Sequence, residues 1–146
     1  MFDSNVFHFL RNNPEISSIL ENHSSAGRIS IFITSIQTVE NSKAPHAKDL
    51  FEIHKNLGVK NVSSIGFVWD FSRLDLDRLG PEKSRWVVEN SGHNRDEVIA
   101  ATAEEIGALL VTEEVYGLRS KAKRNNHPVM NVSELLDWLN QQDLIS

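Results

Sequence analysis

Four acidic side chains occupy places in the chain where carboxylates could do chemistry: Asp3, Glu40, Asp96 and Glu114. Asp3 directly follows the opening residues, and Glu114 comes soon after the apolar run of residues 108–111, so both are expected at the carboxyl ends of buried strands. Ligands of open parallel sheets bind at that edge. Glu40 and Asp96 fall on helical stripes that are expected to face the sheet. Because an unpaired buried carboxylate is costly, such positions need a cation, a proton or a metal ion as partner.

The types of residue restrict which metal this could be. The chain has no cysteine, which excludes a thiolate zinc site, a disulfide framework and a cysteine nucleophile. The six histidines form no pair at helical spacing, and His54, on an apolar stripe, is expected to be half-buried and hydrogen-bonded. Hard oxygen ligands of this kind favour Mg²⁺ or Mn²⁺, which are often shared with phosphate oxygens. The chemistry indicated is phosphodiester hydrolysis by a metal-bound water.

Each acid also has an ordinary structural interpretation. Asp3 could cap a helix, Asp96 and Glu114 could complement helix dipoles, and Glu40 could extend to solvent or pair with a lysine. These interpretations explain each acidic residue separately better than they explain all four jointly, because Arg95 is the only basic residue directly beside any of the four. Arg95 would lie about 100° from Asp96 around a helix.

Hydrophobic periodicity predicts the elements that position these acids. Short apolar runs predict buried strands at residues 29–33 and 108–111, and a weaker one at 129–132. Spacings of three and four predict helices at residues 5–10, 47–57 and 96–106, and a last helix from Ser133 on. Gly58 and Gly107 are placed to end two of them, and Asn94 and Glu97 have the spacing of a capping box. Residues 62–80 remain unassigned, although Asp75 and Asp77 crowd this stretch.

Composition and length bound the class of protein. The 146 residues are 40% hydrophobic and 24% charged, which is typical of one ordinary globular domain. Helices alternating with buried strands predict an α/β sandwich around a largely parallel sheet. No apolar run approaches the roughly 20 residues of a membrane span, and no signal peptide is recognisable, so we expect a cytoplasmic protein. A net charge of −5 argues against nonspecific binding of nucleic acid over the whole surface.

Three segments carry a resemblance to a known family. Residues 94–114 read NRDEVIAATAEEIGALLVTEE, residues 3–6 read DSNV, and residues 34–40 read TSIQTVE. In this order and spacing they resemble the motifs of PIN-domain ribonucleases, including the VapC-type toxins, from end to end of the chain. The resemblance implies a single PIN-like domain over residues 1–146, with a three-layer α/β/α sandwich and a central, mainly parallel sheet.

The resemblance also implies a site and partners. Its acidic quartet around Mg²⁺ or Mn²⁺ would be Asp3, Glu40, Asp96 and Glu114. Asn5 would be a polar support near the metal, and the Thr112 hydroxyl would hold Asp3 or a water. The implied activity is that of an endoribonuclease acting on single-stranded or structured RNA. If the toxin analogy holds, an antitoxin protein would insert a segment over the acidic cleft, and a homodimer is expected.

Two departures from the family pattern motivate other hypotheses. The fourth acid is a glutamate where the family more often has aspartate, so Glu113 could replace Glu114, and only two residues precede Asp3. A second hypothesis is therefore a catalytically weak or inactive PIN-like module that binds RNA or protein. A third is a nucleotide-sensing α/β domain, although the chain has neither a glycine-rich phosphate loop nor a lysine after a late strand.

Two further groups of residues suggest contacts with RNA. A basic stretch after the fourth acid could hold phosphates, or could be a solvated helix face; it consists of Arg119, Lys121, Lys123 and Arg124. Alternating aromatics at Phe67, Trp69 and Phe71 could stack unpaired bases, or could pack in the core or in a dimer interface.

Overall fold

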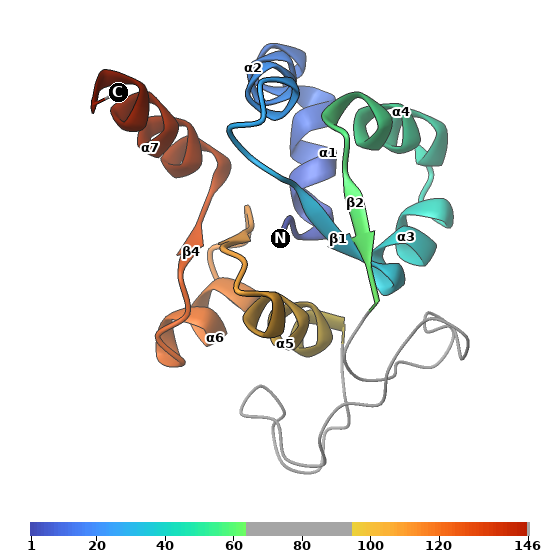
Figure 1. Cartoon of the computed structure of the whole chain (residues 1–146). Helices are drawn as coiled ribbons and strands as arrows, with labels where there is room; N and C mark the ends of the chain where they lie inside the picture. The colour runs from blue at the N-terminus through green and yellow to red at the C-terminus, as the bar shows by residue number, and fades with distance from the viewer. Residues whose placement is uncertain (64–94, 146) are drawn as a thin grey trace.

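The computed structural model describes residues 1–63 and 95–145, which form a mixed α/β structure (Figure 1). The helices in these ranges are α1 (Ser4–Asn12), α2 (Pro14–Ser25), α3 (Ser35–Ser42), α4 (Ala47–Leu57), α5 (Arg95–Ile106), α6 (Leu118–Arg124) and α7 (Val132–Ile145). The strands are β1 (Phe32–Thr34), β2 (Lys60–Val62), β3 (Leu110–Val111) and β4 (Val129–Met130). In the described part of the chain, no helix is both long enough and apolar enough to cross a bilayer.

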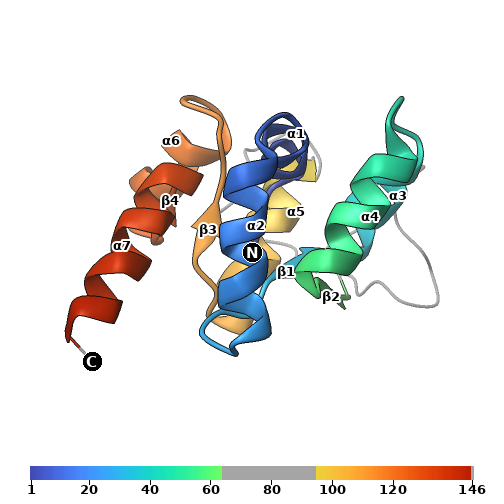
Figure 2. The same ribbon diagram turned by 90° about the horizontal axis from the view of Figure 1, so that it is seen from above.

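The strands form two parallel pairs, and the amino-terminal segment lies between them. β1 pairs with β2, and β3 pairs with β4. Phe2 bridges Val111 in parallel and its amide donates to the Phe32 carbonyl (3.0 Å), so residues 1–3 contact both pairs. Figures 1 and 2 show the amino terminus at the centre of the molecule, between β1 and β3. Asp3 therefore leaves this segment at the same edge at which β1 and β3 end.

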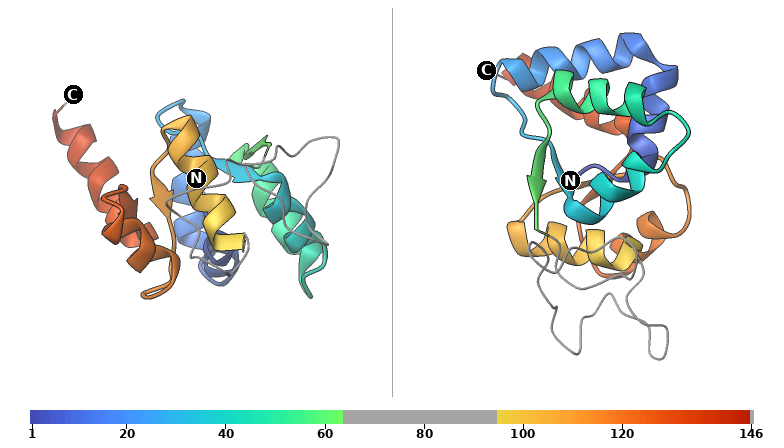
Figure 3. Two further views of the ribbon diagram at one scale, coloured as in Figure 1. Left: turned by 90° about the horizontal axis from the view of Figure 1, so that it is seen from below. Right: turned by 90° about the vertical axis from the view of Figure 1, so that its right-hand side faces the viewer.

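Helices cover the strands from two sides. In the side views, α2, α4 and α7 lie above the strands and α5 lies below them (Figures 1 and 3). One hydrophobic cluster joins α1, α2, α4, α7 and the strands, and its fully buried members include Phe7, Leu20 and Leu50. A second cluster joins α5 and α6 to β3, and in it Ala100 and Ala103 are completely buried. Their small side chains let α5 approach the strands closely, which brings the start of α5 near Asp3.

A buried glutamine fastens the amino-terminal segment to α3. Thr34 and Gln37 form a capping box at the start of α3, in which the Thr34 amide donates to Gln37 Oε1 (2.9 Å). Gln37 Nε2 donates to the Phe2 carbonyl (2.6 Å), and Gln37 is fully buried. Because Glu40 lies three residues further along α3, it shares the helix face that Gln37 turns toward residues 1–3.

The predicted helices are confirmed with small shifts at their ends. α4 and α5 end at the predicted glycines, and both Gly58 (φ 63°) and Gly107 (φ 69°) have the positive φ that glycine tolerates. The first helix is longer than predicted, and the last begins at Val132 instead of Ser133. The capping position Asn94 lies outside the described residues, so the proposed capping box is not seen.

The three strands predicted from apolar runs are present but shorter, whereas the strand expected at the opening residues is only an isolated bridge between Phe2 and Val111. β1 covers only the last two residues of 29–33 and extends to Thr34, because its partner β2 begins at Lys60, soon after the turn that ends α4. β3 likewise covers only the end of residues 108–111. In the weakest run, residues 129–132, β4 stops at Met130, and the amide of Val132, the first residue of α7, donates to the Glu113 side chain. Phe67, Trp69 and Phe71 lie outside the described residues.

Candidate functional site

Asp3 is the most buried of the four predicted acids. It is 5% exposed and caps the N-terminus of α1, where its Oδ1 accepts from the Ser4 amide (2.8 Å). Its Oδ2 accepts from the Thr112 hydroxyl (2.9 Å), a contact between residues at opposite ends of the chain. The helix cap considered from sequence is thus real, and the same carboxylate is also held from β3.

The pKa of Asp3 shows that other carboxylates are near. The pKa of Asp3 is raised from 3.8 to about 6: burial is the main cause, the hydrogen bonds from Thr112 and Ser4 oppose the rise, and the negative charges of Asp96 and Glu114 add to it. Asp96 and Glu114 therefore both act electrostatically on Asp3. Their elements meet because residues 1–3, the start of α5 and the end of β3 share one edge of the structure.

Ser4 connects the fourth acid to this group. Its hydroxyl donates to Glu40 Oε2 (3.0 Å), and its amide donates to Asp3, so one residue holds two of the predicted acids. Ser4 is itself buried. Sequence reasoning gave it no role, although it is the second residue of the DSNV segment.

The Thr112 hydroxyl contacts Asp3, and Asn5 contacts Thr112. Besides donating to Asp3, the fully buried Thr112 hydroxyl accepts from the Glu114 amide (3.2 Å) and from Asn5 Nδ2 (3.3 Å). Asn5 Oδ1 accepts from the Glu113 amide (3.1 Å). These bonds fix the backbone that leads from β3 to Glu114. Because Thr112 accepts in its bonds with Asn5 and Glu114, its single hydroxyl proton is available for the hydrogen bond to the Asp3 carboxylate.

The structure distinguishes between the two candidate glutamates after β3. Glu113 Oε1 accepts from the Val132 amide (2.7 Å) and so caps the start of α7. Glu114 is exposed, and its charge reaches Asp3. Its Oε2 also lies only 3.0 Å from the point where a Cβ would stand on Gly117, the residue before α6. The geometry favours Glu114 over Glu113 as a member of the acidic group.

The ordinary interpretations of the acids are also met in part. Asp96 lies in the first turn of α5, and Glu114 lies near the start of α6, where negative charge is favourable. Within residues 1–63 and 95–145, no lysine or arginine forms an ion pair with Asp3, Asp96 or Glu114. Over the same residues, no three acidic or histidine side chains lie close enough to hold a metal ion. The four acids thus share an edge without forming a closed ligand set.

The basic stretch is partly engaged in ion pairs. Arg119 Nη2 lies 2.7 Å from Glu134 Oε1, and this contact lowers the pKa of Glu134. Lys121 Nζ lies 3.4 Å from Oε1 of Glu97, which is 2% exposed. Sequence reasoning missed this pair, although Glu97 stands three residues before the buried Ala100 on one helix face. Among the four predicted phosphate contacts, Lys123 and Arg124 are the exposed ones.

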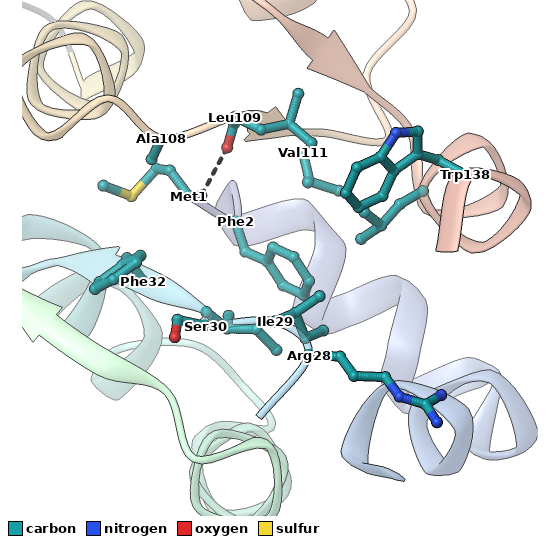
Figure 4. Close-up of a pocket in the computed structure, with 12 residues that line it drawn as sticks. Met1, Phe2, Arg28, Ile29, Ser30, Phe32, Ala108, Leu109, Val111 and Trp138 are labelled. Carbon is teal, nitrogen blue, oxygen red and sulfur yellow. Dashed lines mark hydrogen bonds between the residues drawn. The ribbon is translucent and has the colours of Figure 1, made fainter. Parts of the chain in front are cut away.

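An apolar pocket of about 230 Å³ lies at the opposite end of the strands (Figure 4). It is bordered by Phe2, by the residues that precede β1 and β3, and by Trp138 of α7. Met1 also lines the pocket, and its amino group donates a hydrogen bond to the Leu109 carbonyl (2.7 Å), marked by the dashed line in Figure 4. Because Asp3 and Glu114 follow these strands, the pocket is separate from the acidic edge.

Comparison of the chain with protein-family models, with curated proteins and with solved structures finds no match.

Gly117 is expected to control the position of Glu114. Its backbone (φ 67°, ψ −116°) suits glycine alone, and a Cβ would press on Glu114 Oε2 at 3.0 Å. We expect Gly117→Ala to lower any metal-dependent activity at least about tenfold by displacing that carboxylate. Gly27→Ala is the matched control, because Gly27 also has a positive φ (73°) but has nothing within 4 Å of the added Cβ.

The measurement is activity per folded molecule, with the folded fraction taken from circular dichroism. Both variants are expected to lose stability, on the order of 1–3 kcal/mol, because each forces an L-residue into a positive φ. Equal activity in the two folded variants would show that Glu114 needs no fixed position.

Proposed function

We propose that this protein is a PIN-like, metal-dependent endoribonuclease that hydrolyses phosphodiester bonds of single-stranded or structured RNA. Asp3, Glu40, Asp96 and Glu114 would hold Mg²⁺ or Mn²⁺. The observation that carries the proposal is the raised pKa of Asp3, to which Asp96 and Glu114 both contribute. Asp3, Asp96 and Glu114 form no ion pair with a described lysine or arginine, and negative charges that gather in this way suit a bound dication.

The donor set fits such an ion by chemical type. All four side chains are hard oxygen donors, as Mg²⁺ and Mn²⁺ prefer. Asp3 is held by Thr112 and Ser4 in a fixed orientation, as the ligands of functional metal sites commonly are. Glu114 is exposed on the loop after β3, and Gly117, which has no Cβ, leaves room for its carboxylate there.

The chemistry follows from the charge at this edge. When bound, a dication would lower the pKa of a water, orient the phosphate and stabilise the leaving oxygen. Thr112 keeps the Asp3 carboxylate fixed by donating its proton to Oδ2. Ser4 couples Asp3 to Glu40, so that the two carboxylates keep one relative position while RNA binds. No side-chain nucleophile is needed for this reaction.

The same proposal includes the finer architecture. Residues 1–3 hydrogen bond to β1 on one side and to β3 on the other, so they would be the middle strand of one central, mainly parallel sheet. With helices on both sides of it, this would be the three-layer sandwich of the PIN fold. The protein would act on RNA in the cytoplasm. Its protein partners would be an antitoxin and a second copy of the chain.

A second candidate function is favoured by one observation. Over the described residues, no group of three acids closes around an ion position, and Asp3 is already engaged as the cap of α1. A catalytically weak or inactive module that binds RNA or protein would need no such closure. RNA binding without cleavage under Mg²⁺ or Mn²⁺ would support this second function.

The test of the main proposal is a crystal structure of the protein soaked in Mn²⁺, together with an RNA cleavage assay. We expect an anomalous peak among Asp3, Glu40, Asp96 and Glu114, and cleavage of single-stranded RNA that EDTA abolishes. Manganese bound elsewhere, or no cleavage with any divalent ion, would contradict the nuclease proposal.

A further inference from the structure

The loop between β3 and α6 carries two large apolar side chains into solvent. Val115 is 72% exposed and Tyr116 is 80% exposed, directly after Glu114. Aromatic side chains usually bury much of their surface, because exposing apolar area to water is unfavourable. Two neighbouring exposed apolar side chains beside the acidic edge therefore suggest a partner that covers them.

The ends of this loop are firmly held. Before the exposed pair, the Glu113 amide donates to Asn5, the Glu113 carboxylate caps α7, and the Glu114 amide donates to Thr112. After the pair, Gly117 precedes α6, and Leu118 is fully buried. The backbone on both sides of Tyr116 is therefore held in place. The side chain of Tyr116 has only two χ angles, so fixing its ring in a complex costs little conformational entropy.

We propose that Tyr116 stacks on an unpaired base of the RNA strand whose phosphodiester lies at the acidic edge. The inference rests on the proposed function and narrows its substrate to RNA that is single-stranded at the point of cleavage. Glu114 is two residues from Tyr116, so the base would belong to a nucleotide close to the bond that is cut.

The chemistry of the loop favours a base as the occupant. Residues 113–117 contain no lysine or arginine that could bind a phosphate directly, whereas the ring of Tyr116 can contact the face of a base without any charge. Every base offers such a face, so the contact selects unpaired structure and not sequence. A base inside a duplex is stacked on its neighbours and offers no free face to the ring.

The composition of the chain makes a direct test possible, because Tyr116 is its only tyrosine. Protein labelled with ¹³C at tyrosine gives one set of ring signals by NMR. In the presence of Ca²⁺ in place of Mg²⁺, titration with single-stranded oligoadenylate is expected to move these signals upfield, as a stacked purine would. The duplex of the same strand with oligouridylate is expected to leave them in place.

Substitutions give a second, independent readout. Tyr116→Leu removes the ring and is expected to weaken binding of the oligoadenylate by about tenfold, whereas Tyr116→Phe keeps the ring and the affinity. Phe51→Leu is the control, because Phe51 is an aromatic of α4 that is 67% exposed but is not on this loop. In a cleavage assay the loss in Tyr116→Leu is expected mainly in KM, because the ring holds the strand and does not touch the reacting atoms.

The outcomes separate this inference from the proposed function. Upfield shifts with weaker binding of Tyr116→Leu support stacking, whether or not the RNA is cleaved. If the wild type cleaves RNA while the tyrosine signals stay fixed and Tyr116→Leu binds normally, stacking is wrong and the nuclease stands. If the oligoadenylate does not bind but RNA is cleaved, only the stacking proposal fails. If the oligoadenylate does not bind and no RNA is cleaved with any divalent ion, both proposals fail.

Discussion

Asp96→Asn is expected to lower Mg²⁺-dependent cleavage of single-stranded RNA by at least about a hundredfold, because it removes one proposed ligand charge while keeping the shape of the side chain. Asp96 lies in the first turn of α5 and acts electrostatically on Asp3, so its charge belongs to the acidic edge and is not isolated on the surface. Initial rates of cleavage of a fluorescent RNA provide the measurement.

The control is Asp137→Asn, a change of the same charge at an exposed position of α7. Thermal unfolding adds a readout that needs no activity. Mn²⁺ is expected to raise the Tm of the wild type and of Asp137→Asn more than that of Asp96→Asn, because a ligand stabilises the folded state according to its affinity. Cleavage by Asp96→Asn at the wild-type rate would be decisive against the proposed site.

The metal-free protein is expected to show two opposing pH dependences of stability. The pKa of Asp3 is raised from 3.8 to about 6, mainly by burial, so over this interval the native state binds more protons than the unfolded state. Stability from this group therefore falls as the pH rises from about 4 to 6, by up to about 3 kcal/mol.

His54 acts in the opposite direction. Burial lowers its pKa from 6.5 to about 4; it packs edge-on against the Phe7 ring (4.2 Å between centroids), and Asn41 Nδ2 lies 3.1 Å from its Nε2. Here the unfolded state binds more protons, so stability is full above pH 6.5 and is lost as the pH falls toward 4. The two effects partly cancel in the wild type.

Single variants should separate the two slopes. Asp3→Asn is expected to be more stable than the wild type above pH 6 without divalent ions, and to lose stability as the pH falls below 6.5, as His54 dictates. In His54→Gln, only the loss of stability with rising pH that is due to Asp3 is expected to remain. Urea unfolding between pH 4 and pH 7 in EDTA measures both. If Asp3→Asn leaves the pH profile unchanged, the Asp3 carboxyl has an ordinary pKa, and the electrostatic argument for the acidic edge fails.

Local patterns predicted the helices well and the strands only in part. The stripe of α4 and the glycines after α4 and α5 are signals within a few residues, and a helix satisfies its backbone within itself. A strand needs a partner, and the length of β1 is set by where the turn after α4 lets β2 begin. Neither α2 nor β2 was predicted.

In the candidate site, too, contacts between distant segments were harder to predict than local features. The contact of the Thr112 hydroxyl with Asp3 was expected from the resemblance and is present, whereas the role of Asn5 beside a metal stays a prediction. The pairing of Lys121 with Glu97 was not predicted, because it joins two helices whose packing no local pattern encodes. The role of Ser4 was missed for the same reason, since its hydroxyl reaches Glu40 on another helix.

By itself, the amino-acid sequence determined the mixed α/β class and the ends of two helices. It also determined that acidic residues stand where strands and helices meet. These features depend on residue types only a few positions apart. Only the tertiary structure decided that Glu113 caps α7 while Glu114 stays with the acids. Only it decided that half of the basic stretch is engaged in ion pairs. These outcomes depend on distances and burial between segments up to about a hundred residues apart, which arise only when the helices pack against the strands.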